Sequence, residues 1–187
     1  MTSHSVYFAS TILHLYAAAS IAAGRQNETA HLIFIDQPED KEYPLYSIVQ
    51  QWNTSPFASV RLLPGRFKGI VNKLRKRKQL FNNLEGIIKD LKPGNIFVGN
   101  DRRIEFQFSM HITATLGIQT KGHYMDEGTF TYVGRKASSS FSDAIIDNWL
   151  KKLSYGLWWK NPLTVGESAW ISYVHVAFPK LIDDRLK

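Results

Sequence analysis

The segment Tyr124-Met-Asp-Glu-Gly-Thr129 combines residue types that proton transfer requires. Asp126 and Glu127 are adjacent acids, so one carboxylate can take a proton from a substrate hydroxyl while its neighbour raises its pKa or orders the loop. Gly128 permits a tight turn and a close approach of substrate. Asp, Glu and Gly also favour ordinary surface turns, so an acidic turn is the alternative interpretation of the same pattern.

A second cluster is a cationic run, and its members are Lys73, Arg75, Lys76, Arg77 and Lys78. The surrounding residues 61–103 hold 12 Lys or Arg residues and only three acids. Such a run attracts nucleic acid, an anionic membrane surface or an acidic polysaccharide, whereas the alternative is a solvated helix face. The run lacks interleaved aromatic residues and any RNP, KH or zinc-finger signature, so specific nucleic-acid recognition is not expected.

The third candidate is the polar loop Gly99-Asn-Asp-Arg-Arg103, between a buried strand and the start of a helix. A loop in this position suits an anion or a sugar, although a helix start capped by Asp101 is the alternative. The loop matches neither the Walker A nor the GxGxxG pattern. The sequence has no cysteine, no HExxH and no GxSxG, so we expect no metal site, thiol nucleophile or hydrolase elbow.

Alternating elements must position these residues. Strands are predicted at Val6–Ser10, His31–Ile35, Ser59–Pro64, Asn95–Gly99, Gln119–Met125 and Ile171–Phe178. Helices are predicted at Leu13–Ala23, Asp101–Leu116 and Phe141–Tyr155, with Ser10 or Thr11 capping the first, and Gly69–Leu91 is predicted to form one or two helices. The order predicts an α/β, Rossmann-like three-layer fold with a mostly parallel sheet.

Ligands of such folds bind at the carboxyl ends of the strands. The loops after Phe8, Ile35, Val98 and Met125 are therefore expected at the ligand-binding edge. Four residues in or beside these loops are weaker candidates for sugar contacts, chosen because they lie on that edge: Ser10, Thr11, Asn100 and Thr129.

Length and composition agree with one folded domain of ordinary size. The chain has 187 residues, of which 44% are hydrophobic and 13% aromatic, which excludes a disordered protein. We interpret residues 1–187 as one domain. No apolar run is long enough to cross a bilayer, and no basic residue precedes the apolar stretch Val6–Ala23, so a secretory signal is not expected.

Three segments together resemble bacterial sialyltransferases of the lipooligosaccharide and polysialic-acid type. VYFASTILHLYAAASIAAGR (residues 6–25) is similar to their first strand and helix, and NIFVGNDRRIEFQFSMH (residues 95–111) to a mid-domain strand, loop and helix. YMDEGTFTYV (residues 124–133) resembles their acidic-acidic-Gly motif. The order and spacing of the three segments agree with that family.

The resemblance implies one half of a GT-B glycosyltransferase, which transfers sialic acid or a related acidic sugar from a CMP-activated donor to a surface glycan with inversion. No metal or cofactor takes part in that chemistry. Asp126 would be the general base for the acceptor hydroxyl, and Glu127 and Gly128 would shape the loop. Because the transition state resembles an oxocarbenium ion, the base needs to remove the proton only late in the step.

The sequence departs from that family in one large respect. The second half of the family's proteins carries a His-Pro motif, whose histidine assists departure of the CMP phosphate, and a Ser/Thr pair that holds the nucleotide. Neither is found in this sequence. We therefore expect an amino-terminal, acceptor-side half, inactive alone, with CMP bound by a second glycosyltransferase domain. The cationic run would then hold an acidic glycan acceptor in a cytoplasmic protein, with peripheral contact at the inner membrane. The rival interpretation is a non-catalytic assembly module that binds a polyanion or a membrane surface.

Overall fold

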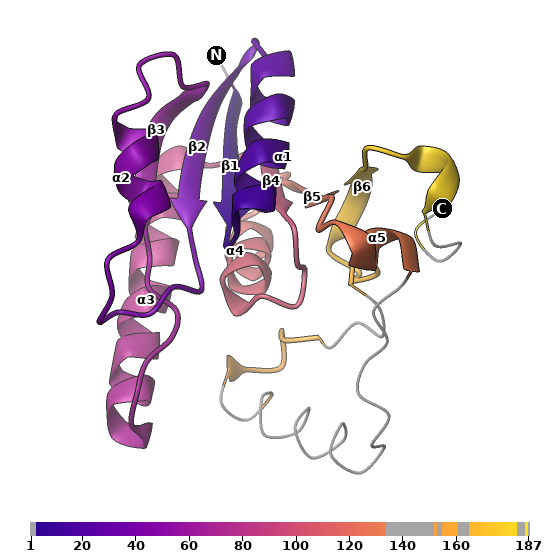
Figure 1. Cartoon of the computed structure of the whole chain (residues 1–187). Coiled ribbons are helices and arrows are strands. Elements are labelled where there is room, and N and C mark those ends of the chain that lie inside the picture. The colour runs from indigo at the N-terminus through magenta and orange to yellow at the C-terminus, as the bar shows by residue number, and fades with distance from the viewer. Residues whose placement is uncertain (1–2, 134–151, 153–154, 161–164, 183–185, 187) are drawn as a thin grey trace.

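The computed structural model describes residues 3–133, 152, 155–160, 165–182 and 186 (Figure 1). The strands are β1 (Ser3–Ala9), β2 (Glu28–Phe34), β3 (Phe57–Leu62), β4 (Asn95–Val98), β5 (Lys121–Met125) and β6 (Ile171–His175). The helices are α1 (Ile12–Gly24), α2 (Pro44–Gln50), α3 (Ile70–Leu91), α4 (Ile104–Thr115) and α5 (Thr129–Val133), followed by the 3-10 helix η1 (Pro179–Leu181).

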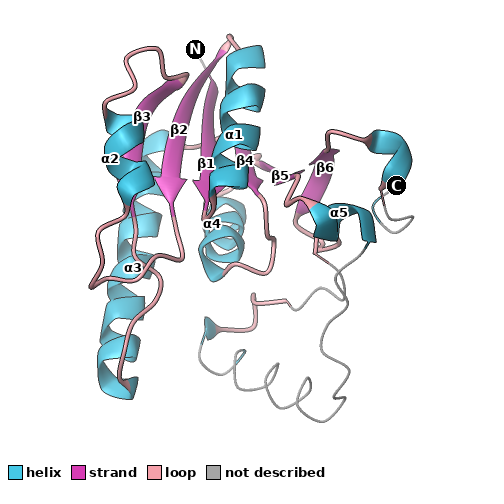
Figure 2. Cartoon of the chain, in the orientation of Figure 1, coloured by secondary structure: helices cyan, strands magenta, loops and turns pink. Residues whose placement is uncertain are grey.

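The described strands form one sheet in the order β3-β2-β1-β4-β5-β6, and every neighbouring pair is parallel (Figure 2). This is the doubly wound order of the Rossmann fold, in which the direction of strand addition reverses between β1 and β4. The predicted α/β, Rossmann-like fold is confirmed. The expected helix at Phe141–Tyr155 lies almost entirely outside the described residues.

Helices cover both faces of the sheet, which explains why its central strands are continuous apolar runs. Val6 and Phe8 of β1 pack in the core formed with α3 and α4, whereas Tyr7 and Ala9 pack in the core formed with α1 and α2. Successive residues of one strand therefore point to opposite layers, as the two-residue period of a strand requires. The three predicted layers are present.

A row of stacked rings crosses the sheet on the side of α1. Tyr7, Phe97, His123 and Tyr173 occupy neighbouring register positions, and their successive ring centroids are 4.3, 4.2 and 4.9 Å apart. His175 approaches His123 with 2.9 Å between ring nitrogens. Burial, followed by the charge of neighbouring groups including His175, lowers the pKa of His123 to about 3.

Some elements differ from those expected. The short helices α2 and α5 were not predicted; α2 begins directly at Pro44, whose fixed φ suits the first turn of a helix. Strand β6 ends at His175 instead of continuing to Phe178. None of the described helices is both long enough and apolar enough to cross a membrane.

Candidate active site

The loops that follow β1, β4 and β5 meet at the carboxyl edge of the sheet, as the parallel topology predicts. The side-chain amide of Asn100 donates a hydrogen bond of 3.2 Å to Glu127 Oε1, which joins the loop after β4 to the loop after β5. Asn100 Oδ1 accepts from the backbone of Arg102 at 3.1 Å. Glu127 therefore connects the loop after β4 to the loop after β5, in which it lies.

Several hydrogen-bond donors hold the carboxylate of Asp126. Its Oδ1 accepts from the backbone N–H of Gly128 at 2.8 Å, and its Oδ2 accepts from the hydroxyl of Tyr132 and from the N–H of Ala177 at 3.2 Å. The sequence analysis did not identify Tyr132 as a functional residue. It lies eight residues after Tyr124 in the same motif, and nothing in that pattern indicated that it would contact Asp126.

Hydrogen bonding keeps the Asp126 carboxyl ionised at neutral pH. Burial alone would raise its pKa, but the donors Tyr132, Gly128 and Ala177 outweigh burial and leave the pKa below its usual value. The group is only half-buried, so it can meet a ligand from solvent. An ionised, reachable carboxylate is what a proton acceptor requires.

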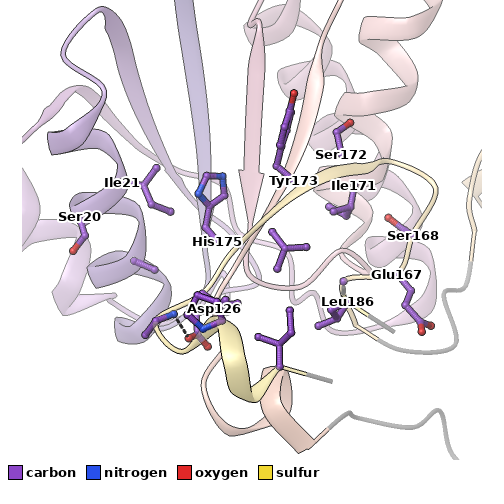
Figure 3. A pocket seen from close by; sticks show the side chains of 17 residues that line it. Ser20, Ile21, Asp126, Glu167, Ser168, Ile171, Ser172, Tyr173, His175 and Leu186 are labelled. Atoms are coloured by element: carbon purple, nitrogen blue, oxygen red, sulfur yellow. Dashed lines mark hydrogen bonds between the residues drawn. The ribbon is translucent and has the colours of Figure 1, made fainter. Parts of the chain in front are cut away.

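Asp126 lines two open cavities. The larger, of about 1090 Å³, lies between α1 and β6, and Figure 3 shows Ser20, Ile21 and His175 around it with Asp126 at one end. The smaller, of about 490 Å³, is lined by Leu13, Thr129 and Tyr132 among others. Both volumes fall in or near the range that small-molecule sites occupy. Asp126 is therefore reachable from two sides.

The loop that carries Asp126 and Glu127 is held in a fixed conformation by its own residues. Gly128 has φ 91°, a left-handed conformation that favours glycine. The hydroxyl of Thr131 accepts from the backbone N–H of Glu127 at 3.0 Å and lies 3.0 Å from the hydroxyl of Tyr124. Thr129 is exposed at the start of α5 and lines the smaller cavity. These contacts fix the direction in which Asp126 points.

The loop after β1 places Ser10 and Thr11 at the same edge, where both hydroxyls already have partners. Thr11 Oγ1 accepts from the backbone N–H of His14 at 3.2 Å and caps α1, as predicted. The hydroxyl oxygen of Ser10 lies 3.1 Å from His14 Nδ1. The backbone N–H of Ser10 donates to the same nitrogen. Burial, with the charge of Arg103 in second place, lowers the pKa of His14 to about 4.

The expected helix cap at Asp101 is wrong. Helix α4 begins at Ile104 with Arg103 at its N-cap position, and no side chain caps it. The buried carboxylate of Asp101 instead accepts from the backbone N–H groups of Gly166 and Ser168 at 2.9 and 2.8 Å. Asp101 therefore anchors a segment far along the chain, which its local sequence could not indicate.

A charged network that the sequence analysis missed occupies the loops after β2 and β3. The guanidinium of Arg66 donates to both carboxylate oxygens of Asp36, at 3.2 and 2.8 Å, and Arg103 approaches the same carboxylate at 2.6 Å. Asp36 has φ 60°, which is uncommon for a residue with a side chain. The loop after Ile35 was expected at this edge, but the pairing depends on residues from three loops.

The cationic run does not form one continuous surface. Lys76 pairs with Glu39 at 2.5 Å, and Arg77 turns inward to the buried Glu105 at 3.8 Å. Lys73, Arg75 and Lys78 remain exposed on α3. Burial raises the pKa of Glu105, against the opposing charge of Arg77. The five residues proposed for polyanion binding are thus divided between structural and solvent-facing positions.

Comparison with known proteins gives only weak likeness to solved structures. No protein-family model matches the sequence, and no curated protein matches it. Among solved structures, the one titled "Crystal structure of TcCGT1 in complex with UDP" aligns with a TM-score of 0.42 and 11% identity. That alignment covers 66% of this chain and 28% of the other, so this chain matches well under two thirds of that protein's length.

Proposed function

We propose that this chain is the acceptor-side half of a sugar transferase, in which Asp126 takes the proton from the acceptor hydroxyl. The observation that supports this most is the position of Asp126 at the carboxyl edge of the sheet, where it lines two open cavities. Ligands of doubly wound sheets bind at this edge.

The proposed step needs only one proton acceptor on this chain. The acceptor oxygen forms a bond to the anomeric carbon of the donor sugar as the bond between that carbon and the nucleotide phosphate breaks, and the proton passes to Asp126 Oδ1. A carboxylate with a lowered pKa is a weak base, which is sufficient when proton removal is late. Tyr132 and the N–H groups of Gly128 and Ala177 would hold the carboxylate in place.

The donor and acceptor are narrower proposals that rest on the resemblance of residues 6–25, 95–111 and 124–133. They are a CMP-activated sialic acid or related acidic sugar, bound mainly by a second domain, and an acidic surface glycan. Ser10, Thr11, Asn100 and Thr129 are proposed to contact sugar; Asn100 and the two hydroxyls after β1 would do so while keeping structural partners. The resemblance implies no metal or cofactor.

Binding is the first test, with the 187-residue chain, acidic oligosaccharides and CMP compared at low and moderate salt. Binding of the glycan without CMP would support an acceptor-side half. Tight binding of CMP would contradict the proposed division between two domains. If neither ligand binds, the non-catalytic module becomes the better interpretation.

The second test is the Asp126→Asn variant of the full-length protein, with the proposed second domain present, in a transfer assay with a panel of CMP-activated sugars. Loss of a general base lowers the rate by roughly 10²–10⁴-fold. Asp90→Asn, an exposed acid near the end of α3, serves as a matched control and should retain full activity. Activity of Asp126→Asn within a few fold of the unmodified chain would show that Asp126 is not the base.

A further inference from the structure

The first part of α3 carries an exposed face that combines apolar and cationic side chains. Val71, Leu74, Arg75 and Lys78 follow one another at spacings of three, one and three residues, which places them on one side of a helix. Val71 is 82% exposed and Leu74 is 62% exposed, and Arg75 and Lys78 are also exposed. Large aliphatic side chains at this exposure, beside cations, suggest a contact surface.

This face is separate from the face of α3 that packs in the core. Leu80, Leu84 and Ile88 are buried against the sheet and α4. Helix α3 has 22 residues, so it is longer than the strands beside it, and Figure 1 shows its first turns extending past the carboxyl edge of the sheet. The projecting part presents its outer face to solvent.

The face also has uncompensated positive charge. No acid occurs in α3 before Glu85. Arg75 donates to the amide of Asn72, and neither Arg75 nor Lys78 forms an ion pair with an acid within the described ranges. The helix therefore resembles a short amphipathic surface with a cationic border.

We propose that the face formed by Val71, Leu74, Arg75 and Lys78 binds the surface of an anionic lipid bilayer. The aliphatic pair would enter the boundary between headgroups and acyl chains, and the two cations would lie among anionic headgroups. Each cation near such a surface strengthens binding roughly fivefold. The proposal is independent of the role of Asp126.

Other binding partners would account for fewer of the four side chains on this face. An acidic glycan or a nucleic acid would use Arg75 and Lys78 but would leave Val71 and Leu74 in water, and the face has no aromatic side chain on which a base or sugar could stack. A second copy of the chain, packed by two-fold symmetry, would bring like charges together. A bilayer accommodates both residue types.

The experiment is co-sedimentation of the full chain with phosphatidylcholine vesicles, with and without phosphatidylglycerol, at low and high salt. We expect binding only to the anionic vesicles, weakened by salt. The double variant Arg75→Gln/Lys78→Gln should bind roughly 25-fold more weakly at low salt. Val71→Asp/Leu74→Asp should lose binding altogether.

Two controls separate this surface from general effects. Ile48→Asp introduces an acid at an apolar residue of α2 that is 60% exposed, and Lys89→Gln removes a cation of α3 that pairs with Glu85 at 2.6 Å. Both should bind anionic vesicles as the unmodified chain does. All variants are checked by circular dichroism and thermal unfolding, so that a fold defect is recognised.

Three results would overturn the proposal. The first is no sedimentation with anionic vesicles. The second is unchanged vesicle binding by Val71→Asp/Leu74→Asp, with loss in Arg75→Gln/Lys78→Gln and competition by free acidic polysaccharide, which would identify a polyanion surface. The third is a concentration-dependent dimer in light scattering that Val71→Asp/Leu74→Asp abolishes, which would identify self-association.

Discussion

The imidazole of His14 lies directly against the backbone of Gly99, so that a Cβ atom on residue 99 would overlap the ring. His14 belongs to the first turn of α1, and Gly99 follows β4. These two elements flank the point at which the direction of strand addition reverses. A glycine at position 99 therefore allows the start of α1 to pack closely against the residue that follows β4, next to the candidate site.

Gly99→Ala should destabilise the fold by about 1–3 kcal/mol, because the added methyl group overpacks a buried ring that Ser10 holds in place. Urea unfolding measures this change. Gly86→Ala is the matched control, since Gly86 lies in α3 with nothing within 4 Å of the added Cβ, and it should stabilise by about 0.5–1 kcal/mol. Equal stability of the two variants would contradict the packing described here.

The buried neutral His14 should make stability depend on pH. Its pKa is lowered to about 4 in the folded chain, mainly by burial, against about 6.5 in the unfolded chain. The unfolded chain therefore binds more protons between these values, and stability falls as pH decreases from about 6.5 to 4, by about 3 kcal/mol from this group. His123, with a pKa lowered to about 3, acts in the same direction.

Urea unfolding across pH 7 to 4 measures this dependence. His14→Gln should flatten the slope, whereas Leu15→Ala, a neighbouring buried position of α1, should lower stability without changing the slope. A His14→Gln slope that matches the unmodified chain would show that His14 does not stay neutral in the fold.

Tyr132→Phe removes a donor from Asp126 Oδ2, so the pKa of that carboxyl should rise. If Asp126 is the base, the acidic limb of the pH–rate profile moves to higher pH, whereas kcat/KM near neutral pH stays within a few fold because the carboxyl remains ionised there. Tyr16→Phe, on an exposed tyrosine of α1, is the control and should leave both unchanged. A loss of rate without movement of the acidic limb would indicate a purely structural role for Tyr132.

Asp101→Asn replaces one of the two oxygens that accept from Gly166 and Ser168 with an amide donor. We expect a loss of about 2 kcal/mol, because a buried backbone N–H is left without an acceptor. Hydrogen exchange at the amides of Gly166 and Ser168 should become faster, while exchange in β1 changes only with global stability. The exposed Asp90→Asn variant should leave both amides protected.

Local patterns predicted most of the elements. The apolar runs, the cap at Thr11 and the carboxyl edge loops correspond to the structure, because each depends on neighbours within a few residues. The short helix α2 has too few turns to show a clear period. The assignment of Asp101 as a cap failed because its partners lie more than sixty residues away, at Gly166 and Ser168.

The sequence by itself determined the fold class and placed Asp126 after a buried strand, since alternation of apolar strands and helices is a local property. Only the tertiary structure decided which groups meet there. Tyr132 and Ala177 converge on Asp126, and Asn100 reaches Glu127 across 27 positions, because the parallel order brings the ends of separate strands to one edge. Such contacts depend on strand order and register, which no short window of sequence contains.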